Sequence, residues 1–129
     1  MIKAIVLLVL SSLLLIPMGC SSAEKSPTFE QISQDKAYEI MKSSTPHIVL
    51  DVRTPEEFAD GHIDGAILIP DYEIEASAKN ILTDKNALIL VYCRSGRRSK
   101  LASQTLTNMG YTNIKEFGGI ITWQYETEK

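Results

Sequence analysis

The sequence predicts an α/β fold, a single domain in which helices cover both faces of a central parallel sheet of about five strands. Two apolar runs, residues 48–50 and 87–91, show no alternation with polar residues, which is typical of strands buried on both faces. Segments with helix-start residues or helical spacing of apolar residues separate such runs along the chain. Strands that alternate with helices at these distances favour parallel pairing beneath helices on both faces.

The predicted elements alternate regularly along the domain. They are a strand at 28–32, a helix at 34–41, a strand at 47–52, a helix at 55–60, a strand at 66–70, a helix at 72–81, a strand at 87–92, a helix at 100–109 and a strand at 114–117. Ser33 suits the N-cap of the first helix. The second helix has a strong start, because Thr54 caps it, Pro55 takes its first position and Glu57 closes a capping box.

Helical spacing and a stop signal define the second half. Ile74, Ala78 and Ile81 fall roughly on one face of the helix predicted at 72–81. Gly110 ends the helix that follows the strand at 87–92. Ligands of open parallel sheets bind beyond the carboxyl ends of the strands, and Cys93 falls at such an end.

The segment Tyr92–Ser99, with the sequence Tyr-Cys-Arg-Ser-Gly-Arg-Arg-Ser, connects a buried strand to a helix. Backbone N–H groups at such a turn, together with the helix dipole, form a cradle for an anion. Cys93 is the first residue of this cradle, and three arginines follow it closely in the sequence. Positive surroundings favour the nucleophilic thiolate over the thiol. The alternative, a buried structural cysteine, would not need three arginines and a glycine within five positions.

This loop resembles the active-site loop of rhodanese-type sulfurtransferases, and two further motifs of that family occur in the same order. They are Ile48–Phe58 with Gly61–Ala66 and Ile69-Pro70 as the N-terminal motif, and Gly118–Trp123 as the C-terminal one. The resemblance covers about residues 28–125. The chain departs from the family at Leu68, where asparagine is frequent, and at Asp64, where proline is frequent; both lie away from the loop.

The resemblance implies that Cys93 is the catalytic nucleophile of a thiosulfate sulfurtransferase. The thiolate would take a sulfane sulfur from thiosulfate or a similar anionic donor, form a persulfide, and pass the sulfur to a thiophilic acceptor such as cyanide, a thiol or a protein. No cofactor is implied. The residues expected to bind the substrate are Arg94, Ser95, Gly96, Arg97, Arg98 and Ser99. Of the three arginines, Arg94 and one other are expected to matter; Ser99 is expected to cap the helix, with a hydrogen bond to the sulfur as the alternative.

Five other positions are expected to have structural roles in or near the site. Asp51 and Arg53 match the family's N-terminal motif, and their expected role is structural, holding loop N–H groups or an arginine. His62 is expected to be packed and hydrogen-bonded, with a catalytic base as the minor alternative. The pair Gly118-Gly119 is expected to allow close backbone approach beside the loop.

Residues 1–19 are predicted to be a signal peptide of the bacterial lipoprotein type. Lys3 precedes an apolar stretch that is shorter than the roughly 20 residues of a membrane span. Gly19-Cys20 resembles a lipoprotein cleavage site, although Pro17 stands where leucine is usual. Cys20 would then carry the lipid, residues 20–27 would be a short tether, and residues 28–129 the domain. An uncleaved anchor or a plain signal peptide are the alternatives, and each places the domain outside the cytoplasm, on the periplasmic or cell-surface side of a membrane.

Charge and cysteine content limit the possible functions. The formal net charge is −3 over the whole chain and −4 without residues 1–19, because Lys3 is the only charged residue there. This acidity argues against nucleic-acid binding, whereas the basic loop suits a small anion. The chain has two cysteines, so with Cys20 lipidated no intramolecular disulfide forms. No paired cysteine or histidine spacing predicts a metal site.

Two other functions stay open. A phosphatase or arsenate reductase would also use a cysteine in an anion cradle, but the Cys-x5-Arg pattern would place arginine at position 99, where this chain has Ser99. A membrane-tethered, non-catalytic binding module is the other alternative. Members of the family without catalysis commonly lack the cysteine, whereas this chain keeps Cys93 and its arginines.

Overall fold

A computed structural model describes Gly19 and residues 26–129. Cys20 and almost all of the predicted signal peptide lie outside the described residues, so both assignments stay predictions. No helix within the described part of the chain is long and apolar enough to cross a membrane.

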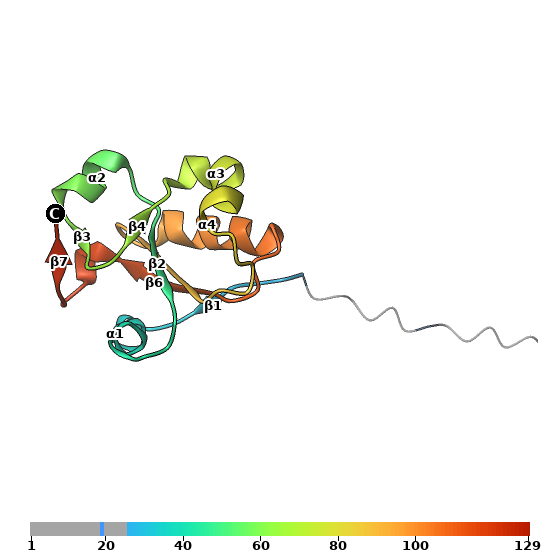
Figure 1. Ribbon diagram of the computed structural model, residues 1–129, viewed down its shortest axis with the longest axis horizontal. Helices are drawn as coiled ribbons and strands as arrows, with labels where there is room; N and C mark the ends of the chain where they lie inside the picture. The colour runs from blue at the N-terminus through green and yellow to red at the C-terminus, as the bar shows by residue number, and fades with distance from the viewer. Residues whose placement is uncertain (1–18, 20–25) are drawn as a thin grey trace, which may run out of the picture.

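A five-stranded parallel sheet forms the centre of the domain, with β5 in its middle (Figure 1). Its order is β1-β6-β5-β2-β4, and every neighbouring pair is parallel. The strands are β1 Glu30–Gln31, β2 Ile48–Asp51, β4 Ile67–Leu68, β5 Ile89–Cys93 and β6 Ile114–Gly119. The predicted parallel sheet of about five strands is confirmed. All five residues of β5 are buried, as the unbroken apolar run predicts.

Helices pack on both faces of the sheet, as predicted. The helices are α1 Gln34–Lys42, α2 Pro55–Asp60, α3 Ile74–Ile81 and α4 Arg97–Asn108, and a 3-10 turn at Asp71–Glu73 precedes α3. Figure 1 shows α1 on one side of the sheet and α3 and α4 on the other, with α2 near the C-terminus. Ser33 caps α1 through the Lys36 N–H, and the predicted capping box of Thr54 and Glu57 is present.

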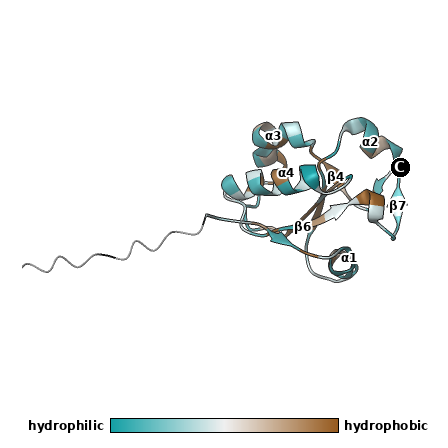
Figure 2. Ribbon diagram, turned by 180° about the vertical axis from the view of Figure 1, so that it is seen from behind, coloured by the Kyte–Doolittle hydropathy of each residue, from teal (hydrophilic) through white to brown (hydrophobic). Residues whose placement is uncertain are grey.

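Two apolar clusters fill the space on either side of the sheet, and hydrophobic residues gather in its central strands (Figure 2). Because side chains alternate along a strand, β5 contributes to both clusters. Val91 and Cys93 lie in the cluster with α3 and α4, whereas Leu90 and Tyr92 lie in the cluster with α1. The alternation therefore directs the Cys93 side chain toward the start of α4.

Two parts of the fold differ from the sequence prediction. Helix α4 begins at Arg97, three residues earlier than predicted, because Gly96 takes the left-handed conformation (φ 103°) and turns the chain directly into the helix. A second sheet, β3 His62–Ile63 with β7 Thr127–Glu128, was not predicted; its two antiparallel strands are short and far apart in the sequence. The second sheet fastens the C-terminal segment beside α2.

Candidate active site

The loop after β5 wraps closely around the Cys93 sulfur. Cys93 is the last residue of β5 and is 1% exposed. The Gly96 N–H donates a hydrogen bond to Sγ, with 3.0 Å between nitrogen and sulfur. Gly96 has a positive φ, a conformation that a Cβ would disfavour, and this conformation turns the chain from the loop into α4. One of the backbone donors predicted for the cradle thus reaches the sulfur itself.

Ser99 lies beneath the sulfur, on the first turn of α4. Its Oγ is 3.3 Å from Cys93 Sγ, and the side chain is fully buried. The expected capping role is wrong, because Gly96 is the N-cap of α4 and no side chain caps that end. The alternative, a hydrogen bond between Ser99 and the sulfur, is present with the opposite direction, because the Cys93 thiol donates to Ser99 Oγ. Position 99, where a phosphatase loop would carry arginine, is thus a small neutral side chain whose hydroxyl accepts a hydrogen bond from the Cys93 thiol.

Glu116 completes this buried group, and no motif in the sequence predicts its place there. The residue lies in β6, is 2% exposed, and its Oε1 accepts hydrogen bonds from Ser99 Oγ (2.7 Å) and from the Gly118 N–H (2.8 Å). A charged residue in the middle of a predicted buried strand was the available signal. Buried carboxylates are rare unless they are paired or hydrogen-bonded, so the position carries information about the site.

The three arginines of the loop have different surroundings. Arg94 and Arg97 are exposed, whereas Arg98 makes two hydrogen bonds to the Glu57 carboxylate, at 2.7 and 3.0 Å. The pKa of Arg98 is raised above its ordinary value, mainly by these hydrogen bonds and also by the charge of Cys93. Arg98 therefore joins α4 to α2 while its positive charge acts on the sulfur.

We expect Glu57→Gln to destabilise the protein by about 1–2 kcal/mol at pH 7, after allowance for partial solvent screening. Hydrogen bonds from Arg98, followed by those from Thr54, lower the pKa of Glu57 from its ordinary value of 4.5 to about 2. Since the folded pKa is the lower one, the ionised carboxylate stabilises the fold fully above pH 4.5, and this contribution declines as the pH falls toward 2. Urea unfolding at several pH values measures it.

The exposed neighbour Glu56, in the same helical turn, provides the matched control. Glu56→Gln should change the free energy of unfolding by less than about 0.5 kcal/mol. Equal stability of Glu57→Gln and the wild type at pH 7 would show that the pair with Arg98 contributes nothing.

A buried polar network holds the end of β2 against the end of β5. Arg53 donates to the Asp51 carboxylate from Nε (3.0 Å) and Nη2 (2.7 Å), and Tyr92, the residue before Cys93, donates its hydroxyl to Asp51 at 2.6 Å. Burial first, and then the Asp51 charge, raise the pKa of Tyr92 well above its ordinary value. Arg53 Nη2 also donates to the Gly61 carbonyl oxygen at 2.8 Å. Asp51 therefore fixes the Arg53 side chain and, through Tyr92, the end of the strand that carries Cys93.

His62 is packed and hydrogen-bonded, as the sequence predicts. Its ring stacks on Phe58 with 3.7 Å between centroids, and Nδ1 lies 2.9 Å from the Phe58 carbonyl oxygen. Nε2 lies 3.2 Å from Glu128, at the C-terminal strand. The ring therefore ties α2 to β7.

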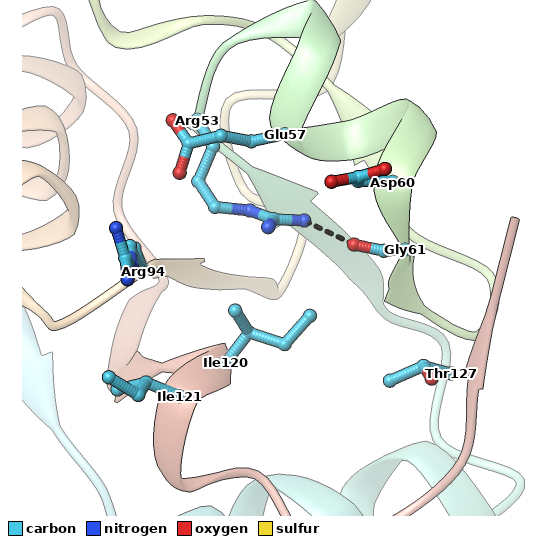
Figure 3. Close-up of a pocket in the computed structure, with 8 residues that line it drawn as sticks. All are labelled: Arg53, Glu57, Asp60, Gly61, Arg94, Ile120, Ile121 and Thr127. Carbon is cyan, nitrogen blue, oxygen red and sulfur yellow. Dashed lines mark hydrogen bonds between the residues drawn. The ribbon is translucent and has the colours of Figure 1, made fainter.

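An open pocket of about 550 Å³ lies next to the loop, and Arg94 of the loop lines it (Figure 3). Its lining residues are Arg53, Glu57, Asp60, Gly61, Arg94, Ile120, Ile121 and Thr127. Figure 3 shows Arg94 and Ile121 on one side of the pocket and Thr127 on the other. Because the walls come from segments far apart in the sequence, the sequence did not predict this pocket. Within residues 26–129, no three His, Cys, Asp or Glu side chains lie close enough together to hold a metal ion.

Comparison with known proteins decides the family. The model of the rhodanese-like domain family matches residues 33–126, which include the loop, Glu116 and the double glycine. The chain belongs to the rhodanese-like domain family. The family assignment agrees with the three motifs recognised in the sequence.

Rhodanese-like relatives of this chain include named sulfurtransferases. Thiosulfate sulfurtransferase PspE of Escherichia coli (strain K12) is 41% identical over 71 residues, which cover 55% of this chain and 68% of the relative. Thiosulfate sulfurtransferase 16, chloroplastic, of Arabidopsis thaliana is 35% identical over 112 residues, covering 78% and 92%. A solved structure of a rhodanese with anions from E. coli shares 36% identity with a TM-score of 0.61, over 64% of this chain and 98% of the other. At the level of the family, the chain is a rhodanese-type sulfurtransferase.

Proposed function

We propose that this chain transfers a sulfane sulfur, from thiosulfate or a similar anionic donor to a thiophilic acceptor, through a persulfide on Cys93. The observation that carries the proposal is the hydrogen bond from the Gly96 N–H to the Cys93 sulfur, in a chain whose relatives include thiosulfate sulfurtransferases. A hydrogen-bond donor fixed on the sulfur favours the anionic forms through which sulfur transfer proceeds.

The proposed reaction has two half-reactions, so ping-pong kinetics are expected. In the first, the Cys93 thiolate attacks the outer sulfur of thiosulfate; a new sulfur–sulfur bond forms, the donor bond breaks, and sulfite leaves with the electron pair. In the second, cyanide, a small thiol or a protein cysteine attacks the terminal sulfur, and Cys93 leaves as thiolate. Arg94, exposed at the pocket, would attract the anionic donor, and the Gly96 N–H would stabilise negative charge on sulfur in both steps.

Intact-mass measurement tests the proposal directly. The purified protein is incubated with thiosulfate, weighed, and weighed again after cyanide is added. We expect a gain of one sulfur atom on Cys93 that cyanide removes as thiocyanate. No gain with thiosulfate or with polysulfide would contradict the proposal and favour a domain that binds without catalysing.

We further propose that Cys20 carries a lipid that holds the domain at a membrane, outside the cytoplasm. The support is the sequence pattern alone, an apolar stretch followed by Gly19-Cys20 and a polar tether. Expressed as the full chain, Cys20→Ser should move from the membrane fraction to the soluble fraction on cell fractionation. Cys93→Ser, which keeps Cys20, is the control and should stay with membranes. Continued membrane association of Cys20→Ser would contradict lipid anchoring at this residue.

A further inference from the structure

A continuous line of hydrogen-bonding groups connects the Cys93 sulfur to a buried carboxylate. Cys93 Sγ lies 3.3 Å from Ser99 Oγ, which lies 2.7 Å from Glu116 Oε1. The three residues are at most 2% exposed and come from three elements, β5, α4 and β6. Neither half-reaction of the proposed sulfur transfer requires Glu116.

The hydroxyl of Ser99 has one proton, so its hydrogen bonds have a direction. Three acceptors lie near it: Glu116 Oε1, the Gly96 carbonyl oxygen at 3.0 Å and the Gly118 carbonyl oxygen at 3.4 Å. The carboxylate oxygen is both the nearest and the one that carries charge, and charge-assisted hydrogen bonds are the stronger ones. When Ser99 directs its own proton to Glu116, its oxygen accepts a hydrogen bond from the Cys93 thiol. The thiol and the carboxylate are then joined donor to acceptor.

Charge limits the protonation states of this group. A carboxylate and a thiolate buried on either side of one hydroxyl repel each other, and burial penalises each of them. The group therefore favours one negative charge, which resides either on Glu116 with Cys93 as the thiol or on Cys93 with Glu116 protonated. A proton passed through Ser99 converts one state into the other without adding a second buried charge.

We propose that Glu116 is a positioning residue that receives the Cys93 proton through Ser99 when the sulfur becomes nucleophilic. The S–H bond breaks, Ser99 Oγ takes that proton, and the original hydroxyl proton moves to Glu116 Oε1, with no change of oxidation state. When an acceptor removes the sulfane sulfur and Cys93 leaves as thiolate, the proton returns by the same route. This inference rests on the proposed role of Cys93 as the nucleophile.

Charged groups on the neighbouring elements also contribute to the electrostatic environment of the Cys93 sulfur. Arg98 of α4 interacts with the Cys93 charge and is itself paired with Glu57 of α2 and close to Asp71. Arg94 is exposed on the loop, and on β2 the Asp51 carboxylate is occupied by Arg53. Glu57, with a pKa of about 2, keeps its charge between pH 5 and 10. Among these groups, Glu116 is the one joined to the sulfur through a hydroxyl.

The test is the pH dependence of Cys93 alkylation by iodoacetamide in the full chain, because this reaction reports thiolate whether or not the protein transfers sulfur. With an internal proton acceptor, the wild-type rate should level off below about pH 6, since proton transfer within the group does not depend on pH. In Glu116→Gln the rate should keep falling about tenfold per pH unit, because the proton must go to water. At pH 5 the variant should react at least about tenfold more slowly than the wild type.

Glutamine is a close match in shape and keeps an acceptor for Ser99 and for the Gly118 N–H, so the variant changes charge and proton affinity with little change in packing. Ser99→Ala is the second variant: it leaves Glu116 in place but breaks the connection, and it should show the same loss of the acid plateau. Glu56→Gln, which removes an exposed carboxylate outside the connected line, should keep the plateau.

The outcomes separate this inference from the proposed function. A wild-type rate that falls about tenfold per pH unit, or a loss in Glu116→Gln that is the same at every pH, would overturn the proton transfer. A plateau retained in Ser99→Ala would also overturn the proton transfer. This outcome keeps the test decisive even if Glu116→Gln does not fold. Failure of the proposed function would give a different result. The wild-type protein would gain no sulfur in the mass measurement, although its alkylation profile would still show the acid plateau.

Discussion

Replacing Cys93 by alanine should abolish sulfur transfer, with a loss of more than about a thousandfold in kcat/KM, while the fold remains. Among residues 26–129, Cys93 is the one free cysteine, and no neighbouring group can form the persulfide in its place. The side chain is small, and its removal leaves the Gly96 N–H and Ser99 without the sulfur, a cost of about 1–2 kcal/mol in the free energy of unfolding. Thiocyanate formation and thermal unfolding measure the two effects separately.

Cys93→Ser is the matched control for hydrogen bonding. Its hydroxyl can still accept from the Gly96 N–H and contact Ser99, so its stability should lie closer to that of the wild type. Sulfur transfer should still be lost. A serine hydroxyl is a weak nucleophile at neutral pH unless a strong base removes its proton. Transfer retained in either variant would refute the persulfide at Cys93.

Local signals in the sequence were sufficient for the framework of the fold. The apolar runs around Leu50 and Leu90 are buried on both faces because helices cover both faces, so their lack of alternation predicts their position directly. The start of α2 was predicted to the residue because Thr54, Pro55 and Glu57 satisfy the helix end by themselves. In both cases the stabilising interactions lie within a few residues or follow from burial alone.

The parts that could not be predicted depend on contacts between distant segments. β3 and β7 each have two residues and pair across more than 60 positions, so neither has a pattern of its own. Ser99 was expected to cap α4, but the early start of the helix places it inside the first turn, where the sulfur and Glu116 surround it. The role of Glu116 depends on the register of β6 against β5, and a single sequence does not specify that register.

Gly119→Ala should be the most damaging substitution that leaves every functional side chain in place. Gly119 pairs with Cys93 across β5 and β6, and its backbone is extended (φ −133°, ψ 154°), so alanine meets no conformational penalty there. A Cβ at this position, however, would lie 1.9 Å from the Arg94 carbonyl oxygen and 2.5 Å from the Ser95 nitrogen. These atoms belong to the backbone of the loop, so the loop itself must move. We expect a loss of at least about 3 kcal/mol in stability.

The displacement should also lower sulfur transfer by about a hundredfold or more, because a shift of about 1 Å in the loop misplaces the Gly96 N–H and the sulfur together. Gly65→Ala is the matched control: its φ is +79°, but a Cβ there meets nothing within 4 Å. That variant should lose about 1 kcal/mol through backbone strain alone and keep full activity. If Gly119→Ala lost no more stability and activity than Gly65→Ala, the close approach of β6 to the loop would cost little, and the loop would accommodate a Cβ there. The larger loss expected at Gly119, where the backbone is unstrained, assigns the effect to that approach.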